Sequence, residues 1–354
     1  WGYGLIEYDN GKYTWFNNQS TNGALSDMLR ISSATYDRNG NLWMACAFDE
    51  HPVAVRTASG QWYSYSYGST LSGAHTGKII CTSNNELWII CPRGAGIMVI
   101  DHNGTPETNA DDHVRHFYPA DADGNNLNNR LNDIAVDANG ALWIASDEGV
   151  FVYDNPEYVM QGYKFYARQP QMVIDGYYQT MLGTERVTSI VIDDGNRKWF
   201  GTDGGGIFLI SADGTTQYAE YNTSNSPLFS NSIKSMAYDS SLGVLYIITD
   251  KGMQAVNISS SKSSSSMADI HAYPNPVTPS YYGDVIIRGV ADNTVVRITD
   301  LMGNLMFETM SNGGGAIWNL RDTKGRRVET GIYLIQCVTE DGTAHKSGKI
   351  HVVK

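Results

Sequence analysis

Residues 134–143 read IAVDANGALW, and this phrase decides the fold because variants of it return along the chain. Close copies are residues 34–43, ATYDRNGNLW, and residues 190–199, IVIDDGNRKW. Two weaker copies end at Trp88 and Tyr246, so the aromatic residues that end the copies stand 45 to 56 residues apart. Self-similarity at this period, with strand signals inside each copy, is typical of the blades of a β-propeller.

Each copy predicts a small four-stranded sheet. Residues 134–136 form a short apolar strand, and the turn at 137–140 contains Asn and Gly, which tolerate the positive φ of a tight hairpin. Residues 142–145 form a second strand, whose continuous apolar run is expected where a sheet is packed on both faces. Residues 150–153 and 163–167 are expected to supply a third strand and an outer fourth. We label these strands A to D, counting outward from the central channel.

The chain is expected to be all-β, because no stretch carries a helical period. It is also expected to divide into three segments. Residues 1–258 contain the repeats and predict a β-propeller with about five blades present. Residues 259–268 are rich in serine and have little to bury, which predicts a flexible linker. Residues 269–354 carry new strand signals between Gly- and Asp-rich turns and predict a small β-sandwich.

The start of the chain resembles the middle of a blade. Residues 3–9 match strand C of the repeats and residues 12–16 match strand D. In one arrangement this pair completes the last repeat and closes a five-bladed ring. In the other, further blades precede Trp1, which is then a processed or truncated end without Met or signal peptide. We expect the second, because an incomplete ring leaves apolar blade faces that invite association.

Composition excludes several classes of protein. The net charge is −12 and no basic patch offsets it, which argues against nucleic acid or anionic membranes as partners. No apolar run of 18 residues is present, so no membrane span is expected. We interpret Cys46, Cys81, Cys91 and Cys337 as free core thiols, since the hairpin register keeps Cys81 and Cys91 too far apart to bridge.

The sequence contains no recognisable catalytic set. Asp147, Glu148 and Asp203 lie in B–C turns, which gather on one rim of a propeller, and a pair of such acids could serve a glycosidase. Asp is equally a common turn former. The eight histidines are scattered, and the Asp-rich loop at 121–126 lacks the bidentate Glu of a calcium loop. We therefore predict a non-enzymatic protein with no catalytic residue, no metal site and no cofactor.

Counting along the repeats predicts a partial ring of cations. Seven residues before the turn Asp of the clear copies stand Arg30, Arg130 and Arg186, and the same step reaches His75 in the second copy and Ser232 in the last. These positions precede strand A, on the same rim as the B–C turns. Forked guanidinium groups there would hold a phosphate or carboxylate of a glycan. The alternative is that each Arg pairs with an acid in the B–C turn of a neighbouring blade.

A row of tyrosines is a second binding candidate. Residues 62–67 read WYSYSY, so that on a strand Tyr63, Tyr65 and Tyr67 share one face and Trp62 the other. The row could stack on sugars, or it could be the packing face of an outer strand D.

Two family resemblances follow from these segments. Residues 128–145 and 199–207 resemble the two-component regulator propeller repeat, which occurs in sensor domains and secreted proteins of the Bacteroidetes. The tail resembles the type A C-terminal sorting domain of the type IX secretion system of that phylum, through residues 273–277 (YPNPV), 298–303 (ITDLMG) and 349–354 (KIHVVK). The chain departs from that family at Thr299, where Tyr is usual, and at Asn319-Leu320, where Asp-Gly is usual.

The resemblance implies a set of sorting-motif residues, which are Pro274, Asn275, Pro276, Asp300, Gly303, Trp318, Gly331, Tyr333 and Lys354. It also implies an exported protein at the cell surface and outer membrane. Such a component of the type IX attachment complex takes part in protein transport and binds secretion-system proteins, anionic lipopolysaccharide, or both.

Two other functions stay open at this point. The chain could be secreted cargo, a glycan-binding or polysaccharide-degrading propeller whose tail is cleaved near residues 259–266. It could also be the sensor half of a histidine kinase, which we disfavour because such sensors continue into a membrane helix. An intact tail in the mature protein would distinguish the machinery component from cargo.

Overall fold

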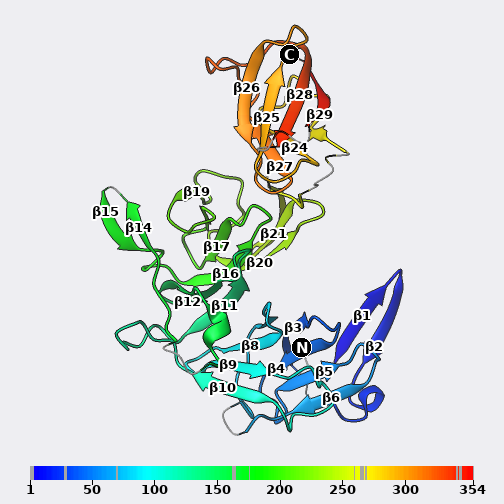
Figure 1. Ribbon diagram of the computed structural model, residues 1–354, viewed down its shortest axis with the longest axis vertical. Helices are drawn as coiled ribbons and strands as arrows, with labels where there is room; N and C mark the ends of the chain where they lie inside the picture. Colours follow the sequence, from blue (N-terminus) through cyan, green and yellow to red (C-terminus); the bar gives the residue numbers. More distant parts are fainter. Residues whose placement is uncertain are drawn as a thin grey trace. The chain divides into compact units, whose positions relative to one another are not determined.

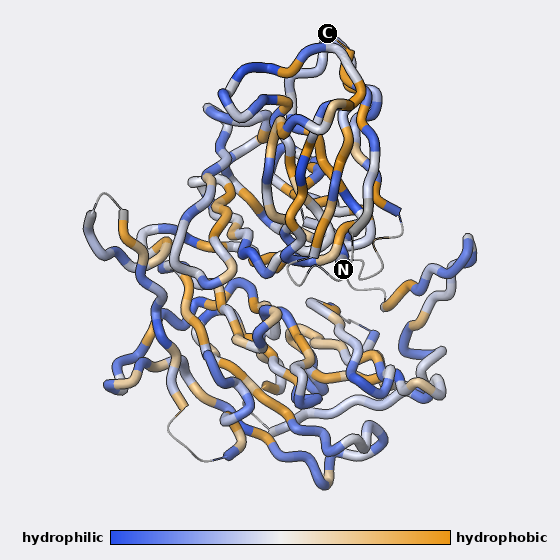
Figure 2. Tube along the Cα trace, turned by 45° about the horizontal axis from the view of Figure 1, so that its top comes forward, coloured by the Kyte–Doolittle hydropathy of each residue, from blue (hydrophilic) through white to orange (hydrophobic). Residues whose placement is uncertain are grey.

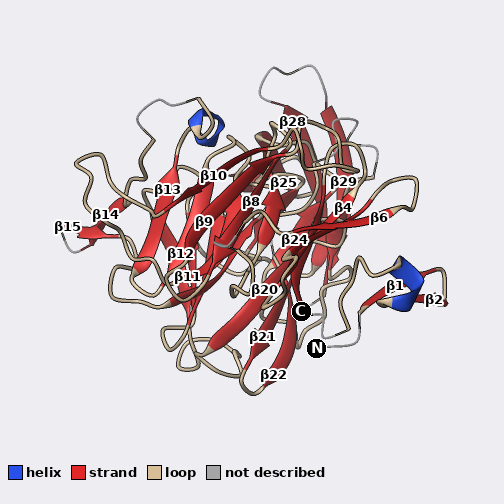
Figure 3. Ribbon diagram, turned by 90° about the horizontal axis from the view of Figure 1, so that it is seen from below, coloured by secondary structure: helices blue, strands red, loops and turns tan. Residues whose placement is uncertain are grey.

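The structure is a computed structural model, and it describes residues 4–27, 30–68, 71–161, 165–174, 176–258, 260–263, 267, 269–339, 342 and 345–353. Strands dominate it, and the described residues contain two short 3-10 helices, Gln19–Thr21 and Pro156–Tyr158 (Figures 1 and 3). The all-β class is therefore confirmed. Two compact units contain residues 1–190, 200–207 and 231–233, and residues 191–199, 208–230 and 234–354.

Each sequence repeat forms one sheet in which consecutive strands are neighbours. The first repeat has β3 (Ile31–Tyr36), β4 (Leu42–Cys46), β5 (Val53–Arg56) and β6 (Trp62–Tyr65). The second has β7 (Ile79–Cys81), β8 (Glu86–Cys91), β9 (Gly96–Asp101) and β10 (His113–Phe117), and the fourth has β16 (Val187–Ile192), β17 (Lys198–Thr202), β18 (Ile207–Ile210) and β19 (Gln217–Tyr221). These sheets match the predicted strands A to D.

The third and fifth repeats form sheets of three strands. They consist of β11 (Leu131–Val136), β12 (Leu142–Ser146) and β13 (Gly149–Tyr153), and of β20 (Ile233–Asp239), β21 (Val244–Thr249) and β22 (Gly252–Asn257). The fourth strand that we predicted at residues 163–167 is wrong as far as the structure describes it. Residues 163 and 164 lie outside the described part, and Phe165 to Ala167 are not in a strand. A hairpin of β14 (Gln171–Ile174) and β15 (Tyr177–Thr180) follows instead.

The opening segment forms the predicted pair of strands, β1 (Leu5–Asp9) and β2 (Lys12–Phe16). They are antiparallel and make a two-stranded sheet of their own, while the last repeat supplies its own third strand, β22. One side of the hairpin packs on the first repeat, where Leu5 and Phe16 contact a buried cluster that includes Met44.

Neighbouring repeats pack face to face through apolar side chains. Trp43 of the first repeat and Ile89 of the second belong to one buried cluster. Trp88 of the second repeat belongs to another, with Ile134 and Phe151 of the third. Figure 2 shows hydrophobic stretches, in orange, recurring along the chain. Burial on both faces explains why strands β8, β12 and β13 read as continuous apolar runs.

The repeated Asp and Trp are partners in a hydrogen bond. The indole Nε1 donates to the carboxylate six residues earlier in each clear copy, from Trp43 to Asp37 at 2.9 Å, from Trp143 to Asp137 at 3.0 Å and from Trp199 to Asp193 at 2.9 Å. The other carboxylate oxygen accepts backbone N–H groups of the turn. The phrase therefore repeats because one buried carboxylate both shapes the A–B turn and satisfies the buried indole.

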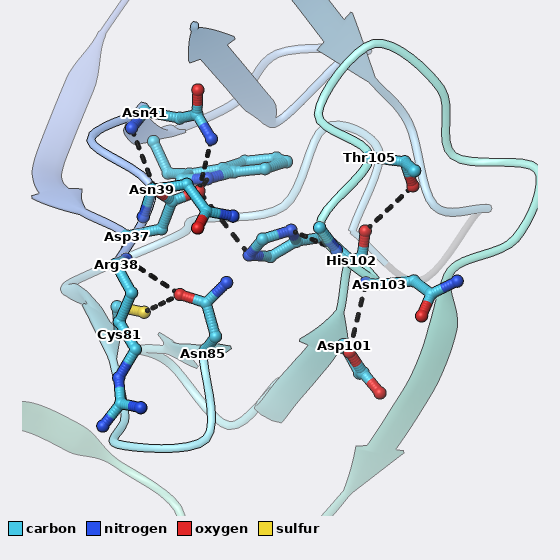
Figure 4. A network of polar contacts seen from close by, with 12 residues as sticks. Asp37, Arg38, Asn39, Asn41, Cys81, Asn85, Asp101, His102, Asn103 and Thr105 are labelled. Atoms are coloured by element: carbon cyan, nitrogen blue, oxygen red, sulfur yellow. Dashed lines mark hydrogen bonds and ion pairs between the residues drawn. The ribbon is translucent and has the colours of Figure 1, made fainter. Parts of the chain in front are cut away.

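In the first repeat the network extends to the second. Figure 4 shows Asn39 and Asn41 close around Asp37, with the ring of His102 facing the carboxylate. His102 Nε2 lies 3.7 Å from Asp37 Oδ2 and its ring lies 4.8 Å from that of Trp43. Burial by itself would raise the pKa of Asp37, but hydrogen bonds from Trp43, Asn41 and Asn39 outweigh it, so the pKa lies below its ordinary value.

The C-terminal segment contains two sheets around one core. The first has β23 (His271–Tyr273), β24 (Val285–Arg288) and β27 (Gly315–Trp318), and the second has β26 (Leu305–Met310), β25 (Thr294–Thr299), β28 (Gly331–Thr339) and β29 (His345–Val352). Buried side chains from both sheets, among them Ile287, Trp318 and Ile335, form a single cluster. The predicted small β-sandwich is therefore confirmed.

The serine tract before this sandwich is ordered where the structure describes it. Ser260 is 0% exposed and its hydroxyl accepts the N–H of Gly195 at 2.7 Å. Ser261 is also buried, and its carbonyl accepts the N–H of Gly314 at 2.5 Å. A flexible linker is therefore the wrong description of these two residues, because hydrogen bonds to the Ser260 hydroxyl and the Ser261 carbonyl hold them. Residues 259, 264–266 and 268 lie outside the described part.

Candidate anion-binding rim

The three predicted arginines occupy equivalent places in their repeats. The N–H of the residue four positions after each Trp donates to the arginine's carbonyl. These pairs are Ala47 to Arg30 at 2.8 Å, Asp147 to Arg130 at 3.1 Å and Asp203 to Arg186 at 2.9 Å. His75 departs from the pattern, because the second repeat has Pro92 at the donor position and proline has no N–H.

A second set of backbone bonds joins three of the B–C turns to the segment before strand A of the next repeat. Phe48 donates to the carbonyl of Ala74 at 2.8 Å, Gly149 to Glu185 at 2.9 Å and Gly204 to Asn231 at 3.1 Å. The residues before strand A and the B–C turns therefore lie together, as predicted. We call this set the rim: Arg30, His75, Arg130, Arg186 and the B–C turns at 47–51, 92–95, 147–148 and 203–205.

One sector of the rim is neutralised by acids. Arg186 Nε donates to Asp147 Oδ1 at 2.8 Å, and its Nη1 donates to Asp203 Oδ2 at 3.3 Å. Arg130 is more loosely placed, with Nη1 3.9 Å from Asp147 Oδ2 and a side chain that is 76% exposed. For Arg186 this is the pairing with B–C acids that we kept as the alternative to an anion site.

In the other sector Ala47 stands at the position of Asp147 and Asp203, and an aromatic ring follows it. Phe48 lies in the B–C turn of the first repeat, and its ring stacks on that of His75, 5.0 Å between centroids with 4° between the planes. The guanidinium carbon of Arg30 lies 5.4 Å from the Phe48 centroid, and that of Arg93 lies 6.0 Å away. Among the residues that the structure describes, neither arginine has a carboxylate partner. Four side chains from two repeats are thus gathered, three of them basic.

Sequence counting missed two members of this cluster. Arg93 stands in the B–C turn of the second repeat, next to the proline that breaks the repeat pattern, and Phe48 stands where the third repeat has an acid. Both have positive φ, 60° for Phe48 and 65° for Arg93, which turns their side chains in a direction that strand alternation does not predict. The only available signal was the basic residue in the second B–C turn.

Burial lowers the pKa of His75, and the nearby charge of Arg93 lowers it further. His75 is therefore largely neutral at pH 7, and the positive charge of the cluster resides on Arg30 and Arg93.

Two acids of the rim, Asp147 and Asp203, serve as counter-ions of one arginine. Asp147 and Asp203 both accept hydrogen bonds from Arg186, and Ser232 donates to Asp203. The Glu148 N–H donates to the hydroxyl of Ser146, and among the described residues its carboxylate has no comparable partner. The carboxylates are counter-ions of an arginine, and one of them closes the contact between two repeats.

The tyrosine row is a packing face. Tyr63, Tyr65 and Tyr67 pack against the buried cluster between the first and second repeats. The hydroxyl of Tyr65 donates to the carbonyl of Pro106 at 2.8 Å, and that of Tyr67 donates to Asp112 at 2.5 Å. Trp62 lies on the opposite side against another cluster. These contacts leave no free row of rings to stack on a sugar.

The described sorting-motif residues maintain the sandwich. Asn275 makes two hydrogen bonds to β29. Its side-chain amide N–H donates to the carbonyl of Lys349 at 2.9 Å, and its side-chain oxygen accepts the N–H of His351 at 3.0 Å. Trp318 is fully buried with its ring 5.3 Å from that of Tyr333. Asp300 accepts three hydrogen bonds in the turn that contains Gly303. Pro274 and Pro276 flank Asn275, Gly331 begins β28, and Lys354 lies outside the described residues.

Other predicted features were also located. The four cysteines are free, and burial raises the pKa of the Cys46 and Cys91 thiols to about 12, which makes them poor nucleophiles. Within the described ranges, no three His, Cys, Asp or Glu side chains come close enough to hold a metal ion. No helix in that part of the chain has the length and apolar character that crossing a membrane requires.

Comparison with known proteins places these features in context. No protein-family model matches the chain, and no curated protein does. Among solved structures, PorZ of Porphyromonas gingivalis matches all of this chain with a TM-score of 0.71 and 29% identity. The chain is PorZ-like. PorZ is described as an essential bacterial surface component of the type IX secretion system, and the chain spans 49% of it, about half its length.

More distant structures are similar in fold only. The extracellular domain of a one-component system from B. thetaiotaomicron covers 99% of this chain and 48% of its own, at 15% identity and a TM-score of 0.49. A gluconolactonase from Xanthomonas campestris covers 72% and 78%, at 11% identity and a TM-score of 0.44. Likeness to PorZ agrees with the β-propeller and sandwich described above.

Proposed function

We propose that this chain is a non-enzymatic component of a type IX secretion system at the cell surface, where it binds secretion-system proteins, anionic lipopolysaccharide, or both. The observation that carries the proposal is the similarity to PorZ along the whole chain, which includes both the repeats and the tail. Association with the outer membrane, and residues 269–354 as a sorting domain after a propeller at 1–258, belong to the same proposal.

The join between the last repeat and the tail supports a retained tail. Ser260 and Ser261 are buried, the N–H of Lys262 donates to the carbonyl of Ser240 at 3.1 Å, and Arg288 of the sandwich donates to the carbonyls of Leu242 and Gly243. A peptidase or sortase needs an extended, accessible backbone, and this one is engaged on both sides. Cargo whose tail is removed would be expected to offer a freer segment.

Mass spectrometry of the mature protein from its native cells tests the proposal. A secretion component is expected to retain the tail through residue 354, whereas cargo is expected to end near residues 259–266. Cell fractionation adds a second readout, because the proposed component should stay with the outer membrane and resist release by salt. A shortened protein free in the medium would contradict the proposal and favour glycan-binding or polysaccharide-degrading cargo.

A further inference from the structure

We propose that Phe48, Arg30, Arg93 and His75 form a binding site for a sugar that carries an oxyanion, either a phosphate or a carboxylate. We call these four residues the Phe48 cluster. The inference rests on the proposed function in so far as it gives anionic glycan a place on the rim. The other sector of the rim, around Arg186, is then structural.

The first argument is charge. The guanidinium carbons of Arg30 and Arg93 both lie within about 6 Å of one ring, and neither has a carboxylate partner among the described residues. An arginine guanidinium has five N–H donors in a fixed geometry and no acceptor, so it binds groups that accept hydrogen bonds. Two such forks around one ring, in a protein of net charge −12, leave donors that an oxyanion would satisfy.

The second argument is the contrast with the equivalent arginine. Arg186 occupies the same backbone position as Arg30, yet its guanidinium is held by Asp147 and Asp203. At Arg30 the position of these acids is occupied by Ala47, and the next residue of the turn is Phe48. The acid that follows it, Asp49, accepts the N–H of His51 at 2.9 Å and the hydroxyl of Ser26. The backbone arrangement is therefore the same in both sectors. Arg186 has carboxylate partners, whereas Arg30 has none among the described residues.

The third argument is backbone strain. Phe48 has φ of 60° and Arg93 has φ of 65°, in the left-handed region that bulky residues rarely adopt. Hydrogen bonds from Phe48 to Ala74 and from Gly73 to the carbonyl of Asp49 hold the first of these turns. Such conformations persist where the surroundings enforce them and concentrate at functional sites. Here they bring the two residues' side chains together.

The ligand class follows from the mixture of groups. Guanidinium forks match the paired oxygens of a phosphate or carboxylate. The Phe48 side chain is 43% exposed although one of its neighbours is the stacked His75 ring, so it offers an apolar surface for the C–H face of a sugar. A sugar phosphate or a uronic acid uses both features, whereas a neutral sugar or a free anion uses one.

Isothermal titration calorimetry of the chain with glucose 1-phosphate, methyl glucuronide, inorganic phosphate and methyl glucoside tests the site. We expect one or both of the charged sugars to bind, inorganic phosphate to bind more weakly and methyl glucoside not to bind. Which charged sugar binds distinguishes a phosphate source from a carboxylate source. R30A/R93A should weaken binding at least tenfold. F48G should also weaken binding, although glycine relieves the left-handed backbone.

The matched control is R130A/R186A, which removes two arginines of the same rim and should leave affinity within about threefold. If R30A/R93A does not fold, R30K/R93K keeps both charges and removes the forks, and it should still weaken binding. Unchanged affinity in a folded R30A/R93A or R30K/R93K variant, equal loss in R130A/R186A, or no binding of either charged sugar would overturn the proposal. If the tail is cleaved in the native protein but the charged sugar still binds, the proposed secretion role is rejected and the Phe48 cluster site stands.

Discussion

The turn aspartate is the residue on which each repeat depends. Asp137 is buried and accepts the N–H groups of Asn139 and Ala141 and the indole N–H of Trp143. Removing the carboxylate leaves the buried indole N–H and two partly buried backbone N–H groups without this acceptor, and an unsatisfied buried donor costs about 1–3 kcal/mol. We therefore expect Asp137→Ala to lower the free energy of unfolding by about 3 kcal/mol, measured by urea denaturation.

Asp121 offers a matched control, because its turn has the same pattern of hydrogen bonds as that of Asp137. Asp121 accepts the N–H groups of Asp123 and Asn125 and the Asn125 amide in the same pattern, but on the surface. Water can replace it there, so Asp121→Ala should shift the unfolding midpoint far less. Equal effects of the two substitutions would show that burial of the carboxylate is not what makes it important.

The pKa of His75 reports on the Phe48 cluster. Burial and the charge of Arg93 hold this pKa below the 6.5 of an unfolded chain. As pH falls through 6.5 the unfolded state gains the proton first, so His75 reduces stability on acidification. Arg93→Ala should raise the pKa towards 6.5 and lessen that loss, as seen in an NMR titration of the imidazole. Arg130→Ala should leave the pKa unchanged, and a similar shift there would contradict the assignment of Arg93 to the cluster.

For single residues, the sequence predicted where the rim arginines lie in their repeats better than it predicted which side chains they contact. Arg30, Arg130 and Arg186 could be assigned equivalent places in their repeats because a fixed count from the turn Asp is preserved when the repeat is preserved. Whether an arginine meets an acid or a ring depends on side-chain direction in the B–C turn. Phe48 and Arg93 have left-handed backbones without being glycine, and nothing in a single sequence indicates that.

Elements were predictable wherever an apolar run meets a turn signal. The exception is the segment at 163–167, whose apolar and aromatic residues read as an outer strand. In the structure Phe165 stacks on Tyr153 at 4.6 Å with 3° between the planes, and Arg168 forms the isolated bridge to Val152. The aromatic side chain fills the core beside the third repeat instead of extending its sheet. A hydrophobic pattern alone cannot distinguish these two uses of an aromatic residue.

The contact between consecutive repeats depends on close backbone approach at the B–C turn. Gly149 has φ of 81°, and a Cβ there would lie 2.7 Å from the carbonyl oxygen of Met181 and 2.9 Å from that of Leu182. Gly149→Ala should therefore cost about 2–4 kcal/mol in thermal or urea unfolding, because strain and overlap add. Gly140→Ala is the control: its φ is 87° but a Cβ meets nothing within 4 Å, so it should cost only about 1–2 kcal/mol.

For the chain as a whole, the main consequence concerns how the tail is attached to the last repeat. The second compact unit contains both, and its contacts include Arg288 of the sandwich with Asn257 and with the carbonyl of Gly243. Composition predicted a boundary near residue 258 but not this attachment, because polar serines read as linker whether or not a partner backbone covers them. Their partners are distant in the chain: Gly195 precedes Ser260 by 65 residues, and Gly314 follows Ser261.

Gly314 is the point at which this attachment can be tested. Its N–H donates to Ser261 at 2.5 Å, and an added Cβ would meet the carbonyl oxygens of Ser261, at 3.0 Å, and Lys262. Gly314→Ala should therefore separate the two backbones and expose the peptide bond after Lys262. We expect trypsin under native conditions to cut there at least tenfold faster than in the wild type, with the fragments identified by mass spectrometry. Gly303→Ala strains a turn of the same sandwich without touching the serine tract, so it should leave the rate unchanged. If Lys262 is cut equally fast in all three proteins, the serines do not protect the junction, and the argument for a retained tail loses its structural support.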